Sequence, residues 1–207
     1  MKTLFLTSYF SSVGNLFRNF IQEQILAKQV LFIPTAGNVE HYVGYIDEAK
    51  YVFQTLGFSV DILDIANTSE VVIKEKIKQT PYLYISGGNT FYLLQELKKK
   101  QLLSLIKEQI RDGLIYVGES AGAIITAKDI DYNKLMDDKT VAKELSDTTG
   151  LDEVEFYILP HYGEEPFTDS SKKTFETYKN QLDLMRMNNL QAVIVNDKEI
   201  KVVSEQD

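Results

Sequence analysis

Residues 114–125 read Leu-Ile-Tyr-Val-Gly-Glu-Ser-Ala-Gly-Ala-Ile-Ile, and the organisation of the whole chain follows from this stretch. An apolar run breaks at Gly118 and resumes after Gly122, which predicts a strand, a sharp turn and a helix. Ser120 stands between two glycines that let the chain double back tightly. A short Gly-x-Ser-x-Gly also occurs in ordinary turns, but a strand before it and a helix after it favour a nucleophile elbow, with the serine oxygen exposed above the sheet.

The predicted helix after Ser120 adds a second chemical feature. The first N–H groups of a helix have no acceptor within the helix, and the dipole places partial positive charge at the same end. An oxyanion formed when Ser120 attacks a carbonyl would lie beside these groups. The stretch therefore favours acyl transfer.

Length and composition indicate one α/β domain spanning residues 1–207, since 44% hydrophobic residues in 207 suffice for one substantial core. The N-terminal residues Met1-Lys2-Thr3-Leu4-Phe5-Leu6-Thr7 enter a strand pattern directly, without the features of a signal peptide. No apolar run approaches the length that crosses a membrane. We expect a cytoplasmic protein with no membrane partner.

The absence of cysteine excludes a thiolate nucleophile, a disulfide framework and cysteine-ligated metal. We expect no metal and no cofactor. A formal net charge of −8 argues against nucleic acid as a partner, because phosphate binding needs a basic face.

Strands and helices alternate along the chain, which predicts a doubly wound, mostly parallel sheet covered by helices on both faces. A polar, acidic excursion follows the elbow over residues 128–154, and the C-terminal part is expected to hold a helix at 168–188 and a closing hairpin. Expected strands lie at 3–7, 30–34, 58–63, 82–85, 114–117, 156–159, 191–195 and 199–203.

Turns rich in glycine and polar side chains follow two further strands of the predicted sheet. They are Thr35-Ala36-Gly37-Asn38 and Ser86-Gly87-Gly88-Asn89-Thr90. In sheets of this class, sites lie at the carboxyl ends of the strands, so both turns should share one edge with Ser120. Gly88 can present its backbone N–H to an anionic oxygen, and Asn89 or Thr90 can cap the next helix. A plain glycine turn with a helix cap explains the same residues.

A serine nucleophile needs a general base, and histidine has a suitable pKa. Of the two histidines, His161 follows a predicted strand at the edge where Ser120 should stand. His41 lies at the start of a helix and fits a surface position better. We therefore assign His161 as the base.

The third member should be a carboxylate that accepts from the other ring nitrogen. Candidates lie in the polar excursion and just after the histidine, and spacing alone does not choose among them: Asp129, Asp131, Asp137, Asp138, Glu164 and Glu165.

Three motifs together resemble the peptidase E family of serine peptidases, which also includes cyanophycinases. They are Gly-Glu-Ser-Ala-Gly-Ala at 118–123, Ser-Gly-Gly-Asn-Thr-Phe at 86–91 and Leu-Pro-His-Tyr at 159–162. The resemblance covers nearly the whole chain. It implies a class I glutaminase-like α/β fold and a serine nucleophile, with cleavage of dipeptides that begin with aspartate in the best-known members.

Carried over by motif, the resemblance implies that Ser120 is the nucleophile and His161 the base, with Gly88 and Ala121 donating backbone N–H groups to the oxyanion. It places the acid on the segment Leu135-Met136-Asp137-Asp138.

Between the two aspartates we favour Asp138, since burial on alternate positions would put it on the same side as Met136, with Asp137 as the other candidate. We expect Asn89 and Thr90 to contact substrate.

The segment after His161 is acidic, which argues against preference for an N-terminal aspartate. The sequence thus predicts a dipeptidase-like serine peptidase, monomeric or homodimeric, acting on a small peptide. An esterase or amidase with the same elbow, and a non-catalytic small-molecule-binding member of the fold, are the alternatives.

Overall fold

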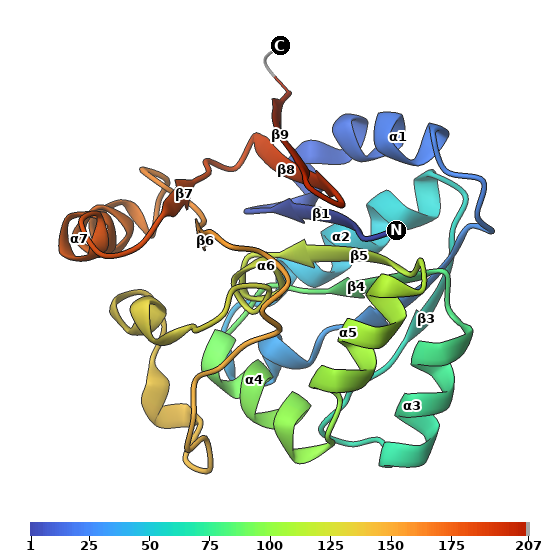
Figure 1. The fold of residues 1–207 in the computed structure, drawn as a ribbon, viewed down its shortest axis with the longest axis horizontal. Coiled ribbons are helices and arrows are strands. Elements are labelled where there is room, and N and C mark those ends of the chain that lie inside the picture. The colour runs from blue at the N-terminus through green and yellow to red at the C-terminus, as the bar shows by residue number, and fades with distance from the viewer. Residues whose placement is uncertain (206–207) are drawn as a thin grey trace.

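A computed structural model describes residues 1–205 as a sheet of seven strands with helices on both faces (Figure 1). The strand order is β3-β2-β4-β5-β1-β8-β9. Strand bounds are β1 Thr3–Thr7, β2 Gln29–Ile33, β3 Ser59–Ile62, β4 Tyr82–Ile85, β5 Ile115–Glu119, β6 Tyr157–Leu159, β7 Leu184–Arg186, β8 Gln191–Asn196 and β9 Glu199–Ser204. Helix bounds are α1 Gly14–Gln22, α2 Gly44–Thr55, α3 Glu70–Gln79, α4 Thr90–Lys99, α5 Leu103–Arg111, α6 Ala121–Ile124 and α7 Thr168–Tyr178, with 3-10 helices η1 Phe10–Val13, η2 Thr35–Val39, η3 Asp131–Leu135 and η4 Lys139–Val141.

The sheet is mostly parallel, as the alternation of strands and helices predicts. Strands β3, β2, β4, β5 and β1 run parallel to one another, while β8 pairs antiparallel with β1 and with β9, which forms the predicted C-terminal hairpin. The predicted α/β fold class is confirmed. Because the parallel strands all end at one edge, the turns after β2, β4 and β5 meet there.

Alternate residues of the central strands pack into two separate hydrophobic cores, one on each face of the sheet. Phe5, Phe32 and Tyr84 pack with Phe17 of α1 and Phe53 of α2 on one face. The other face packs against α3, α4, α5 and α6 through aliphatic side chains that include Leu6, Ile33, Ile85, Ile77, Leu94 and Ile106. This burial on both faces explains why the strands read as continuous apolar runs.

Strands β6 and β7 form a small parallel sheet of their own, beside the main one (Figure 1). The predicted helix over 168–188 is therefore wrong in its second half, since α7 ends at Tyr178 and β7 begins at Leu184. Leu182 and Met185 are half-buried against the main core. A few apolar residues fit a strand as well as a helix, and pairing with β6 decides the conformation here.

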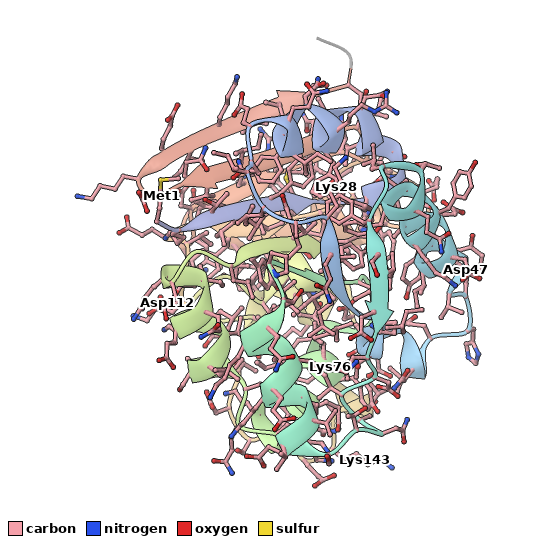
Figure 2. All side chains as sticks on the ribbon, turned by 90° about the vertical axis from the view of Figure 1, so that its right-hand side faces the viewer. Met1, Lys28, Asp47, Lys76, Asp112 and Lys143 are labelled. Atoms are coloured by element: carbon pink, nitrogen blue, oxygen red, sulfur yellow. The ribbon has the colours of Figure 1, made fainter. Side chains whose placement is uncertain are left out.

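Most charged side chains lie on the outside of the molecule, as do Asp47, Asp112 and Lys143, which Figure 2 labels near its outer edge. Within residues 1–205, no helix is both long enough and apolar enough to cross a membrane.

Candidate active site

Ser120 occupies a strained elbow between β5 and α6. Its backbone has φ 46° and ψ −105°, outside the regions that most residues adopt. The N–H of Ser120 donates to Thr7 O at 2.8 Å, and its carbonyl accepts from Ala123 and Ile124. A Cβ on Gly122 would lie 2.2 Å from the carbonyl oxygen of Ile85, so only glycine allows this turn to pack on β4. The elbow predicted from the sequence is present.

His161 reaches the elbow from the end of β6. Its Nε2 lies 3.0 Å from Ser120 Oγ, and its side chain is buried. The imidazole stacks on the Phe167 ring, with 4.7 Å between centroids. The backbone N–H of His161 donates to Ser8 Oγ at 3.2 Å, which ties the small sheet to the end of β1. His41, the other histidine, is exposed on the loop before α2.

The residue opposite the second ring nitrogen is Asn189, which the sequence analysis missed. Asn189 Oδ1 lies 2.7 Å from His161 Nδ1. An amide oxygen can only accept, so this contact puts the proton on Nδ1 and leaves the lone pair of Nε2 facing Ser120. The expectation of a carboxylate here is corrected to a neutral amide.

Neither favoured aspartate contacts His161. Asp138 uses its carboxylate to cap η4, accepting from the N–H and hydroxyl of Thr140. Asp137 is half-buried and accepts from the N–H of Thr90 at 2.8 Å, from its hydroxyl at 2.6 Å and from Asn133 Nδ2 at 2.8 Å. The compact turn of η3 replaces the extended segment that the choice of Asp138 assumed.

The other carboxylate candidates are also placed elsewhere. Asp129 accepts from the N–H of Asp131, and Asp131 pairs with Lys134 and Lys139. Glu165 is exposed, while Glu164 is near enough to raise the pKa of His161 through its charge.

The turn after β4 presents Gly88 beside the elbow. Gly88 has φ +127°, and a Cβ there would lie 2.3 Å from the carbonyl carbon of Ala36, so the turn requires glycine. A Cβ on the preceding residue, Gly87, would lie 3.4 Å from Ser120 Cβ. Within residues 1–205 no acceptor is found for the Gly88 N–H. Ala121 begins α6, where an N–H has no acceptor within the helix.

Asn89 and Thr90 hold this turn through their side chains. Asn89 Oδ1 caps α4 by accepting from the N–H of Tyr92 at 3.0 Å, and its Nδ2 donates to the carbonyl of Asp138. Thr90 is fully buried on Asp137. Their expected contact with substrate stays a prediction, while Asp137 fixes the start of α4 behind the turn.

Electrostatics favour a neutral imidazole. Burial lowers the pKa of His161, and the hydrogen bond to Asn189 and the charge of Glu164 oppose this shift only in part. A histidine that acts as a base must be unprotonated, and the lowered pKa of His161 favours that form at neutral pH. Across residues 1–205 there is no group of three or more histidine, cysteine, aspartate or glutamate side chains placed to share a metal ion.

Comparison with known proteins assigns this chain to a family. The model of peptidase family S51 matches residues 3–203. The chain belongs to peptidase family S51. It is 43% identical over 203 residues to an uncharacterized peptidase of Pasteurella multocida (strain Pm70), covering 98% of this chain and 97% of that protein.

Two further relatives support membership in the S51 family. A peptidase E of Nostoc sp. (strain PCC 7120) is 30% identical over 167 residues, 78% of this chain and 66% of its own. The crystal structure of a candidate peptidase E from Listeria monocytogenes EGD-e superposes with a TM-score of 0.93 at 39% identity, covering 99% of this chain and 98% of that one. The resemblance to peptidase E found in the sequence motifs is confirmed.

Replacing Asn189 with aspartate should raise the pKa of His161 in this S51 family member. A negative charge beside Nδ1 favours the imidazolium, and an opposite charge at this range shifts a pKa by about one unit or more. Since only the neutral ring acts as base, the acid limb of the pH profile should move to higher pH by about one unit. Asn188→Asp is the control, adding the same charge one residue away. Equal shifts in both variants would show that Asn189 has no special relation to the ring.

Replacing Gly88 with alanine should lower kcat by about a hundredfold to a thousandfold, the usual effect of losing one oxyanion donor. The new Cβ would overlap the Ala36 carbonyl, so the turn must shift away from Ser120. Gly113→Ala is the matched control, because Gly113 also has a positive φ, +104°, but open space around it. Steady-state kinetics that fall equally in both variants would contradict the assignment of Gly88.

Proposed function

We propose that this S51 family member is a serine hydrolase that cleaves the amide bond of a small peptide through an acyl-enzyme on Ser120. The contact of 3.0 Å between Ser120 Oγ and His161 Nε2, at a strained elbow, carries the proposal. Peptidase names among the relatives support an amide bond as the target.

In this mechanism Ser120 Oγ attacks the substrate carbonyl carbon while its proton passes to His161 Nε2. The carbonyl oxygen becomes an oxyanion and receives the N–H groups of Gly88 and Ala121. His161 then gives its proton to the leaving amine, the C–N bond breaks, and the acyl group remains on Ser120. Water, deprotonated by the same imidazole, attacks the ester and releases the acid.

Asn189 holds the imidazole in the tautomer that this mechanism needs. Its oxygen fixes the proton on Nδ1 and orients Nε2 toward Ser120. An amide carries no charge, so it stabilises the imidazolium less than a carboxylate would.

That neutral partner supports a second candidate, an esterase. An alkoxide or phenoxide departs with less help from an acid than an amine does, so an ester places a smaller demand on the imidazolium. Asn189 is the specific observation that favours this alternative.

A panel of dipeptides and matched activated esters would separate the two candidates. A peptidase should turn over at least one dipeptide with kcat/KM in the enzyme range, above about 10⁴ M⁻¹s⁻¹, and should form an acyl-enzyme. Turnover of esters alone would support the esterase. No turnover of either class, together with tight binding of a panel member, would indicate a binding protein and overturn the proposal.

A further inference from the structure

A buried carboxyl lies directly behind the nucleophile, and the mechanism above does not use it. Glu119 is the last residue of β5 and is 1% exposed. Its Oε1 accepts from the N–H of Phe10 at 2.8 Å, and its Oε2 accepts from the hydroxyl of Tyr84. A third donor, the N–H of Gly87, lies 3.4 Å from Oε2.

The Gly87 contact connects this carboxyl to the oxyanion turn. Gly87 precedes Gly88, and a Cβ on Gly87 would lie 3.4 Å from Ser120 Cβ, so this backbone packs directly against the elbow. Within residues 1–205, Glu119 is the acceptor found for the Gly87 N–H. The side chain thus joins the strand that carries the nucleophile to the turn that carries an oxyanion donor.

We propose that Glu119 is a positioning residue, whose carboxylate holds the Gly87 N–H and thereby fixes the Gly88 N–H in line with the oxyanion formed at Ser120. This inference rests on the proposed function of Ser120 and Gly88. It assigns a role to the residue before the serine, which the Gly-x-Ser-x-Gly motif leaves unspecified.

The donors around Glu119 explain why a carboxylate is needed. The N–H groups of Phe10 and Gly87 can only donate, while the hydroxyl of Tyr84 can also accept. In Glu119→Gln, the single amide oxygen serves the shorter contact to Phe10, and the new NH₂ donates to Tyr84. That NH₂ then faces the Gly87 N–H, donor against donor, so the variant keeps two partners and loses the third.

The same contact should respond to pH. Burial raises the pKa of Glu119 to about 7, although the hydrogen bonds from Tyr84, Phe10 and Gly87 lower it in part. The other ionisable groups that act on Glu119 come from α2: Glu48 raises its pKa, and Tyr45 is kept neutral by burial with its own pKa raised. Protonation of Glu119 below about pH 7 should therefore weaken the hold on Gly87.

Kinetics of Glu119→Gln test the proposal. We expect kcat to fall by at least tenfold, up to the hundredfold to thousandfold effect of losing an oxyanion donor, with KM within about twofold. The rate at which a fluorophosphonate labels Ser120 should fall in parallel. The wild type should show an acid limb near pH 7 that the variant lacks, because glutamine does not titrate.

Thr80→Val is the matched control for stability alone. Thr80 is a buried polar residue at the opposite end of β4, where its hydroxyl donates to Tyr82 O and accepts from the N–H of Leu31. Its loss should lower Tm while leaving kcat unchanged. A Glu119→Gln variant with kcat within twofold of the wild type, or with an unchanged limb near pH 7, would overturn the proposal.

Amide NMR of the wild type keeps the proposal testable if Glu119→Gln does not fold. The Gly87 and Gly88 amide resonances should titrate with a midpoint near pH 7, and flat resonances would overturn the inference. Failure of the proposed function looks different, because the fluorophosphonate would then leave Ser120 of the wild type unlabelled.

Discussion

Replacing Ser120 with alanine is expected to lower kcat by about a million-fold, the loss seen when a serine hydrolase loses its nucleophile. The hydroxyl oxygen of Ser120 is the atom that would form the acyl-enzyme, and its hydrogen-bond partner in the structure is His161 Nε2. Alanine keeps the same Cβ in the same strained conformation, so the elbow should be preserved. Steady-state kinetics on the best substrate of the panel measure the effect.

The fold serves as the internal control for this variant. Tm and the near-ultraviolet circular dichroism of Ser120→Ala should match the wild type, because the hydroxyl adds little to packing. Retention of more than about a tenth of the activity in a folded variant would contradict the nucleophile assignment, since this lies far above the expected residual activity.

Replacing His161 with alanine should cause a loss of similar size, because base and nucleophile act as one unit. The variant leaves a cavity beside Phe167, where the imidazole ring stacked. Added imidazole should restore part of the activity by occupying that space. Below the step near pH 7 expected from Glu119, activity of the wild type should fall a second time as the His161 ring is protonated. The lowered pKa of His161 places this second step below the ordinary histidine value of about 6.5.

His41→Ala is the matched control for this prediction, because His41 is exposed on a loop. It should keep nearly full activity. Severe loss in both variants would show that His41 also serves the site, and full activity in His161→Ala would exclude His161 as the base.

The main sheet and the elbow could be predicted from the sequence because their signals are local. Continuous apolar runs such as residues 82–85 fit strands buried on both faces, and Gly118 and Gly122 stand where the backbone packs too closely for a Cβ. His161 followed from the rule that sites lie at strand ends, although its strand β6 belongs to the small sheet rather than the main one.

Asn189 could not be predicted, for two physical reasons. The apolar residues before it fit a helix as well as the strand β7, and only pairing with β6 turns this segment toward His161. An asparagine also differs from the carboxylate that the chemistry of a triad suggests. The available signal was the pair Asn188-Asn189 after Met187, which fits a turn at a strand end better than a helix interior.

Asp137 shows the converse error. An aspartate after the elbow helix fits the third member of a triad by position, but the partners of Asp137 are the start of α4 and Asn133. Desolvation raises the pKa of Asp137 to about 6, so a raised carboxyl pKa does not by itself identify the catalytic acid.

Mass spectrometry of the protein after reaction with a fluorophosphonate tests whether Ser120 is the nucleophile. We expect one adduct per chain, located by peptide mapping on Ser120, and no adduct in the Ser120→Ala and His161→Ala variants under the same conditions. An unlabelled wild type, or an adduct on another residue, would contradict this assignment.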